Sequence, residues 1–321
     1  MKHVHPVRAL LALIALPGLA SCATNGGVGR LPETAGAATR VVLVSVAGLT
    51  AEALPHMPTL QAMADAGVVA ERLSGVAPAS KRPAHATLVT GATPAAHGIV
   101  AERRLGDRGV RDAGYDHASL LRTDTLWQRG VEAGVGVAAL DWPTTLGAAI
   151  PELLPDLGAR GRERAWSERL RGETTPAMLE RVTRHGGDAP ESGAPGPVHD
   201  AVVGGVACDL ARSDPAPRLL LLRLSQAEPV LLRLGPEARA VDDAFAAVDR
   251  ALRELLLCLD DAGALVDTAV AVVGDHGVDG VHTEIAPNAV LVREGLIDPR
   301  IGGTWSAIAR SNGGSAFVYA R

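Results

Sequence analysis

The sequence predicts an α/β fold in which a mostly parallel central sheet carries helices on both faces. Short apolar runs, typical of buried strands, alternate along the chain with longer segments of helical spacing. The clearest strand is the apolar run 269–273, which is followed by Gly274, Asp275, His276 and Gly277. It places a carboxylate and an imidazole at the carboxyl end of a strand, where open α/β sheets hold their sites.

The order of the elements follows from the apolar spacing and from the glycines and prolines that interrupt it. We expect strands at 40–46, 68–73, 135–140, 218–224, 269–274 and, as an edge strand, 315–320. We expect helices at 57–66, 83–90, 123–133, 198–212, 236–262 and 287–294. Residues 158–197 are rich in Arg, Glu, Gly and Pro, and we expect a short surface helix there within a long, partly mobile insertion.

The amino-terminal residues have the pattern of a bacterial targeting segment. Lys2 and Arg8 accompany an apolar stretch, 9–16, that is too short to span a bilayer. The segment closes on Leu-Ala-Ser-Cys22, which resembles a lipoprotein box, with ordinary secretory cleavage as the alternative. Ala23 follows Cys22 and favours an outer-membrane address. We therefore expect a periplasmic protein whose membrane partner is reached through a lipid on Cys22.

We expect three parts along the chain. Residues 1–21 are the expected signal peptide, 22–39 a flexible tether rich in Gly, Ala and Thr, and 40–321 one α/β domain. The net charge is −5 and the basic residues are spread out, so we expect no nucleic-acid partner. Cys258 lies in an apolar helical run and fits a small core residue, while a Cys208–Cys258 disulfide is the alternative in an oxidising compartment.

A second segment is more specific than the Asp-His pair. The run from Pro78 to Gly91, followed by 94–99, resembles the nucleophile segment of the alkaline phosphatase superfamily, closest to its type I phosphodiesterase/nucleotide pyrophosphatase branch. The stretches 41–49, 141–143 and 275–277 agree with that branch in order and spacing. The resemblance implies an alkaline-phosphatase-like three-layer sandwich. It also implies a Thr or Ser nucleophile at a helix N-terminus and two metal ions, usually zinc.

Residue by residue, this sequence departs from the family pattern. The first strand of the family ends in a metal-binding Asp, and that position is Ala47. The nucleophile position, nine residues before Thr90, is Lys81, and Ser80 could replace it only through a register shift. Alignment on Gly-Pro at 235–236 puts Glu228 where a second Asp belongs and Leu232 where a His belongs.

The family's last histidine ligand lies downstream of the Asp-His pair and has no counterpart before Arg321, so the resemblance implies a C-terminally truncated fold. Asp275 and His276 alone match the ligand set, with Glu228 and His282 as weak replacements. An exposed loop position is the simpler expectation for His282. Two ligands do not hold a catalytic zinc ion, so we expect no bound cofactor, and zinc only if the protein is active.

A carboxylate buried without its metal needs another cation. We therefore expect the Lys81 ammonium group to form an ion pair with Asp275. His85 and His97 match family positions that do not bind metal, and we expect both to be hydrogen-bonded structural residues.

Three functions follow from these expectations. The first is a catalytically impaired lipoprotein of this family that binds a phosphate-containing small molecule through Lys81, Arg82 and a helix N-terminus. The second is an active metal-dependent phosphoric ester hydrolase that uses Ser80 and a reduced metal site. The third is a structural or partner-binding envelope lipoprotein that makes contact through 158–197.

Overall fold

The computed structural model describes residues 11–13, 38–105, 112–157, 166–186, 197–300 and 304–321. Cys22 and nearly all of the expected tether lie outside the described residues, so the signal peptide, the lipid anchor and the tether remain predictions. In the described part of the chain, no helix combines the length and the apolar character needed to cross a membrane.

The centre of the molecule is a sheet whose five parallel strands confirm the predicted fold class. Their spatial order is β9 (Thr268–Gly274), β2 (Arg40–Val46), β8 (Leu219–Leu224), β6 (Val137–Trp142) and β7 (Glu152–Pro155). Beyond β9 lies β1 (Leu11–Leu13), which pairs antiparallel with both β9 and β3 (Val68–Val69). The strands β6, β8 and β9 are apolar almost throughout because helices cover both faces of the sheet.

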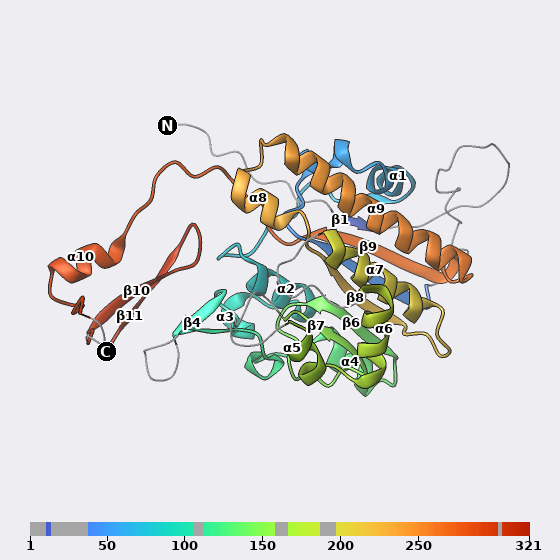
Figure 1. The fold of residues 1–321 in the computed structure, drawn as a ribbon, viewed down its shortest axis with the longest axis horizontal. Coiled ribbons are helices and arrows are strands. Elements are labelled where there is room, and N and C mark those ends of the chain that lie inside the picture. The colour runs from blue at the N-terminus through green and yellow to red at the C-terminus, as the bar shows by residue number, and fades with distance from the viewer. Residues whose placement is uncertain (1–10, 14–37, 106–111, 158–165, 187–196, 301–303) are drawn as a thin grey trace.

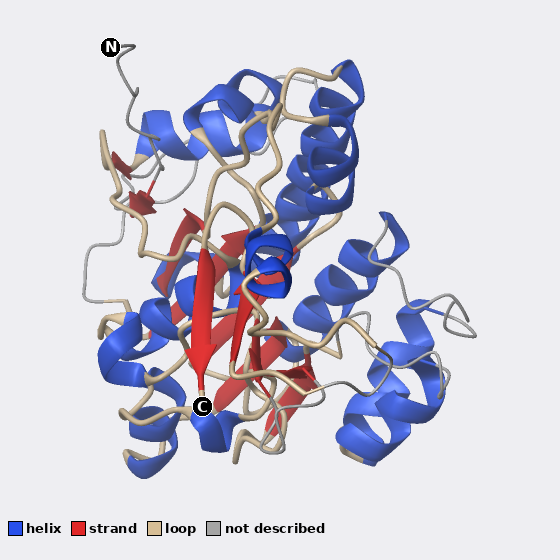
Figure 2. Cartoon of the chain, turned by 90° about the vertical axis from the view of Figure 1, so that its left-hand side faces the viewer, coloured by secondary structure: helices blue, strands red, loops and turns tan. Residues whose placement is uncertain are grey.

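Helices lie on both faces of this sheet (Figures 1 and 2). The larger core joins one face to α1 (Pro58–Ala66), α7 (Pro197–Ala211), α8 (Glu228–Leu234) and α9 (Arg239–Asp261). On α9, buried apolar residues recur every three or four positions: Val241, Phe245, Val248, Leu252, Leu255 and Leu259. The smaller core joins the opposite face to α2 (Lys81–Thr90) and α4 (Leu126–Glu132).

The insertion is more integrated than expected. It contains two helices, α5 (Trp166–Glu173) and α6 (Pro176–Gly186), rather than one. Leu170, Met178 and Val182 from these helices are buried in the larger core, while most of their other described residues are exposed, so two helices at the surface are anchored to the domain where one short helix was expected. Residues 158–165 and 187–196 lie outside the described residues, and the expected mobility there stays a prediction.

Several boundaries differ from the sequence prediction for local reasons. The helix expected at 123–133 begins at Leu126 because Thr125 and Gln128 form a reciprocal capping box. The strand expected at 68–73 is reduced to two residues. The described residues also form three short 3₁₀ helices, Ala51–His56, Ala118–Leu120 and Leu265–Asp267, and one short α-helix, α3 (Pro94–His97).

The last part of the chain lies beside the main domain rather than in its sheet (Figure 1). It carries α10 (Pro287–Arg293) and an antiparallel hairpin of β10 (Ala307–Ser311) and β11 (Ala316–Ala320). The strand expected near 315–320 therefore exists, but it is not an edge strand of the central sheet. A second small hairpin joins β4 (Arg103–Leu105) to β5 (Asp112–Gly114).

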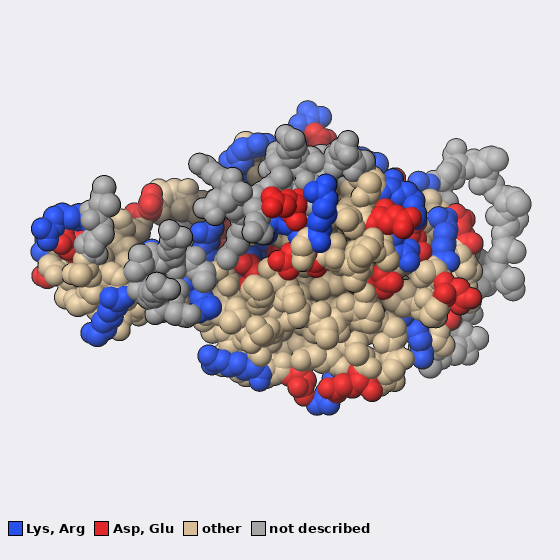
Figure 3. Space-filling model, turned by 60° about the horizontal axis from the view of Figure 1, so that its bottom comes forward, with Lys and Arg blue, Asp and Glu red and all other residues tan. Residues whose placement is uncertain are grey.

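Two further features concern stability and the surface. Cys208 on α7 and Cys258 on α9 form a disulfide, with Cα atoms 5.6 Å apart. The alternative is therefore the one that the structure shows: Cys258 is buried as expected, but it is paired with Cys208 and is not a free core thiol. On the face drawn in Figure 3, acidic and basic side chains alternate around a broad uncharged area. On that face no concentration of one charge is visible.

Candidate functional site

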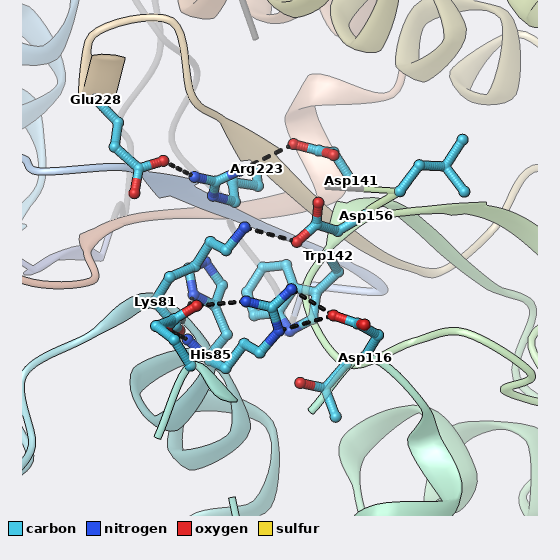
Figure 4. Close-up of polar contacts among 12 residues, drawn as sticks. Lys81, His85, Asp116, Asp141, Trp142, Asp156, Arg223 and Glu228 are labelled. Atoms are coloured by element: carbon cyan, nitrogen blue, oxygen red, sulfur yellow. Dashed lines mark hydrogen bonds and ion pairs between the residues drawn. The ribbon is translucent and has the colours of Figure 1, made fainter. Parts of the chain in front are cut away.

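Most of the functional residues predicted from the sequence lie at the carboxyl edge of the parallel sheet, and Figure 4 shows Lys81 and Glu228 there. The strands β2, β8, β9, β6 and β7 all end there, and the N-terminus of α2 faces the same edge. Asp275 directly follows β9. The last residue of β9, Gly274, packs so closely against the backbone of Leu49 that only glycine fits there. A Cβ atom at that glycine would lie 2.3 Å from the carbonyl oxygen of Leu49, so no larger residue fits.

The N-terminus of α2 is capped by a residue from outside the helix. Ser80 occupies the N-cap position, yet its side chain makes no capping hydrogen bond. The backbone N–H of Arg82 instead donates to Oε1 of Glu102 at 2.7 Å. Asn312, from the β10–β11 turn, donates to the Ser80 hydroxyl at 3.4 Å and accepts from the Glu102 backbone N–H at 2.9 Å. A carboxylate thus already occupies the positive end of this helix.

The Arg82 side chain is buried and engaged by two carboxylates. Its guanidinium group contacts Glu102, and its Nε donates to Asp116 at 3.0 Å. Burial alone would lower the pKa of Arg82, but Glu102 and Asp116 raise it above its usual value. Arg82 is therefore a fixed cation that is fully committed to internal partners.

Lys81 is paired with a different carboxylate from the one that we expected. Its Nζ donates to Oδ2 of Asp156 at 2.8 Å, and both side chains are largely buried. Burial alone would raise the pKa of Asp156, but Lys81, Arg223 and Arg82 hold it well below its usual range. The predicted Lys81–Asp275 ion pair is wrong because β7, a strand absent from the sequence prediction, brings Asp156 to the same edge.

Asp275 is buried, and only one of its two carboxylate oxygens accepts hydrogen bonds, both from backbone N–H groups. Its Oδ1 accepts the N–H of Gly48 at 2.9 Å and that of His276 at 2.8 Å. Its Oδ2 makes no hydrogen bond and lies 3.9 Å from His85 Nδ1 and 3.7 Å from His276 Nε2. Burial alone would raise the pKa of Asp275, but His276, His85 and Arg223 lower it.

The two histidines expected to be structural are hydrogen-bonded, which confirms that prediction. Nδ1 of His85 lies 2.7 Å from the Lys81 carbonyl oxygen, so this nitrogen carries the proton. Burial lowers the pKa of His85 to about 4, so its ring is neutral. Nε2 of His97 bonds Thr87 at 3.0 Å, and its Nδ1 accepts the N–H of Ile99 at 3.1 Å.

Arg223, like Asp156, is a site residue that sequence reasoning missed. It interrupts the apolar strand β8, and its side chain is only 3% exposed. Nη1 lies 3.2 Å from Oδ2 of Asp141, and Nη2 contacts Glu228 (Figure 4). Burial alone would lower the pKa of Arg223, but Glu228 and Asp141 raise it. The signal was present in the sequence, because a single arginine in the run Leu-Leu-Leu-Leu-Arg-Leu has to find buried partners.

His199, at the start of α7, adds a second cation to the same carboxylate. Its Nε2 lies 3.2 Å from Oδ2 of Asp141, the oxygen that Arg223 also contacts. Burial alone would lower the pKa of His199, but Asp141 raises it to about 8. Asp141 itself adopts a left-handed backbone conformation with φ 54, which turns its carboxylate toward these partners at the end of β6.

Comparison with known proteins decides the lineage. The profile of the family described as type I phosphodiesterase / nucleotide pyrophosphatase matches residues 41–321. The chain belongs to this family. Through it, the chain is a member of the alkaline phosphatase superfamily. No curated protein matches the chain significantly in sequence.

Solved structures agree in fold. Murine ectonucleotide pyrophosphatase / phosphodiesterase 5, an inactive variant with AMP, superposes with a TM-score of 0.58 at 19% identity, covering 81% of this chain and 63% of that one. Phosphonoacetate hydrolase from Sinorhizobium meliloti with phosphonoformate gives 0.57 at 19% identity, covering 88% and 65%. The chain therefore spans less than two thirds of the length of either neighbour.

The remaining family positions do not converge on a metal. Glu228 is the first residue of α8 and is paired with Arg223. Leu232, at the expected His position, is 65% exposed. His282 is exposed and contacts Thr283 at 2.9 Å. Among the described residues, no three His, Cys, Asp or Glu side chains are grouped so that they could hold a metal ion.

The donor chemistry explains this arrangement. Where the family places a metal-binding Asp, the buried methyl group of Ala47 offers no ligand atom. Where it places the nucleophile, Lys81 presents a cation that repels a metal ion. The side chains described at this edge therefore do not fit the two zinc ions that are typical of the family.

Proposed function

We propose that this chain is a catalytically impaired member of its family, an envelope lipoprotein that keeps the phosphodiesterase fold without metal-dependent phosphoester hydrolysis. One observation carries the proposal: at the nucleophile position, the Lys81 ammonium group is bound to Asp156 at 2.8 Å. An ammonium group in an ion pair has no lone pair with which to attack phosphorus. Loss of a covalent nucleophile alone costs on the order of a thousand- to a million-fold in rate.

Ser80 is the nucleophile of the alternative proposal, an active phosphoric ester hydrolase. Its hydroxyl group accepts a hydrogen bond from Asn312 at 3.4 Å, and no base among the described residues is bonded to it. A serine is activated by a base or a metal ion within hydrogen-bond reach. The geometry therefore favours the impaired enzyme.

Turnover of bis-p-nitrophenyl phosphate and p-nitrophenyl phosphate, with zinc supplied, tests the proposal. We expect the protein and its Ser80→Ala variant to show the same background rate. Turnover that disappears in Ser80→Ala but persists in Ser74→Ala, a change at an exposed serine, would establish the active hydrolase instead.

A phosphate-containing small molecule is the ligand that we propose for the impaired site. The murine neighbour was solved with AMP and the bacterial neighbours with phosphonoformate or phosphonoacetate. Lys81, Arg82 and the α2 N-terminus supply positive charge, but Asp156, Asp116 and Glu102 engage all three. Such a ligand would therefore have to displace Glu102, the most exposed of these carboxylates.

We also propose that the protein is anchored in the periplasm by a lipid on Cys22. The Cys208–Cys258 disulfide supports this location, because disulfides persist in oxidising compartments. Replacement of Cys22 by Ala should move the protein from the membrane fraction to the soluble periplasmic fraction. Retention of that variant in the membrane fraction would contradict the proposal.

The third possibility, a partner-binding role for 158–197, has less support. Leu170, Met178 and Val182 from α5 and α6 are buried in the core of the protein itself and are unavailable to a partner.

A further inference from the structure

The carboxyl edge of the sheet concentrates acidic side chains that water cannot solvate. Asp141, Asp156 and Asp275 are each less than 10% exposed, and the side chain of Glu228 is 16% exposed. Carboxylates in such surroundings stay ionised only when a cation or several hydrogen bonds compensate for the lost water. At the two ligand positions of the family that keep a carboxylate here, 228 and 275, metal ions would supply that charge in a metal-dependent member. Here the charge must come from side chains.

Arg223 supplies it at one position. Its guanidinium group bridges two carboxylates that are far apart in the sequence, Asp141 near the end of β6 and Glu228 on α8. A planar guanidinium group with several N–H donors is suited to holding two carboxylates at once. Because Arg223 extends from the central strand β8, it links the end of the neighbouring strand β6 to helix α8.

Lys81 supplies charge at a second position, where it holds Asp156. Figure 4 shows the two cations as separate centres, each facing its own carboxylates. Asp275 keeps its charge through the N–H groups of Gly48 and His276 and through the field of Arg223.

We propose that Arg223 and Lys81 are built-in replacements for the two metal ions, so that this edge folds on ion pairs and needs no metal. The proposal rests on the proposed function but concerns stability, not turnover. A guanidinium or ammonium group provides fixed charge, yet it neither coordinates a water molecule as a metal does nor accepts a substrate oxygen as a ligand. The replacement would thus preserve the fold while removing the chemistry.

Thermal unfolding of the full protein tests this proposal. We expect the same midpoint with excess EDTA and with added zinc. We expect Arg223→Met to lower the midpoint by roughly 6 °C or more, because it leaves Glu228 without its cation and Asp141 with His199 alone. Arg233→Met, at an exposed position on the neighbouring helix α8, is the matched control and should change little.

A triple variant separates charge from packing. Adding Asp141→Asn and Glu228→Gln to Arg223→Met removes the stranded charges, and Asn tolerates the left-handed conformation at residue 141. We expect the triple variant to recover much of the lost midpoint, even if Arg223→Met alone fails to fold.

Three results would overturn the proposal: a midpoint that falls with EDTA and recovers with zinc, an Arg223→Met midpoint equal to that of Arg233→Met, or a triple variant no more stable than the single one. Turnover by the natural protein would contradict the proposed function alone, since none of these measurements uses a substrate.

Discussion

At the scale of single residues, Glu102 shows how the protein fills a site with its own groups. Its carboxylate accepts the Arg82 N–H and contacts the Arg82 guanidinium group. The exposed fraction of its side chain is 31%, against 7% for that of Asp116 on the other side of Arg82. Glu102 is therefore the partner that an external anion could displace most easily.

Removing this carboxylate should open the site. We expect Glu102→Ala to bind inorganic phosphate and AMP at least about tenfold more tightly than the natural protein, because charge-assisted hydrogen bonds are worth roughly 1.5–3 kcal/mol. Isothermal titration calorimetry measures the difference, with Glu71→Ala at an exposed position as the control. Equal affinities in all three proteins would show that α2 does not form an anion site.

His199 gives the protein a pH-dependent contribution to stability. Its pKa in the fold, about 8, lies above the unfolded value of about 6.5. The protonated ring paired with Asp141 therefore stabilises the fold fully below pH 6.5, and this contribution is lost as the pH rises through 8. It amounts to about 2 kcal/mol at most.

Urea unfolding at pH 6.5 and pH 9 measures this contribution. We expect the natural protein to lose more stability across the interval than His199→Gln. Asp200 titrates near pH 6, because burial raises its pKa, and so it changes little above pH 6.5. An identical loss in both proteins would show that His199 is not the titrating group.

The sequence predicted some of the site residues and missed others for physical reasons. Asp275 and His276 were placed correctly because a buried strand ending in polar residues is a strong local signal. The partner of Lys81 was not predictable, since Asp156 follows a four-residue strand too short to show a period. Arg223 was overlooked because apolar runs are usually assigned to the core as a whole.

At the scale of elements, local signals predicted most strands and helices of the central domain but not their partners. β11 was recognised as a strand, yet its composition could not show that it pairs with β10 rather than with the sheet. The insertion was judged by its charged composition, and the few apolar residues that anchor it carried little weight.

Substitution of one of these anchoring residues tests whether the insertion packs into the core. Met178 on α6 is fully buried in the larger core. We expect Met178→Ala to lower the free energy of unfolding by roughly 2–5 kcal/mol, because it leaves a cavity. Leu232→Ala, at a 65% exposed position, should cost less than about 0.5 kcal/mol. Equal losses in urea unfolding would mean that α6 is not part of the core.

At the scale of the whole molecule, the chain keeps the fold of its family, and we propose that it lacks the metal-dependent chemistry. The profile match across 41–321 and the five parallel strands show that the architecture of the family is kept. At the functional edge, a methyl group stands at the family's ligand position 47, an ammonium group stands at the nucleophile position 81, and Arg223 adds a buried guanidinium group. Each of these groups lacks a ligand atom or adds a positive charge, and all of them disfavour a metal ion.

The zinc content of the purified protein tests this central claim most directly. After equilibration with zinc and dialysis, we expect far less than one zinc ion per chain by elemental analysis. The double variant Ala47→Asp/Lys81→Thr, which restores two family positions, should retain more zinc than the natural protein. One or two tightly held zinc ions in the natural protein would contradict the account.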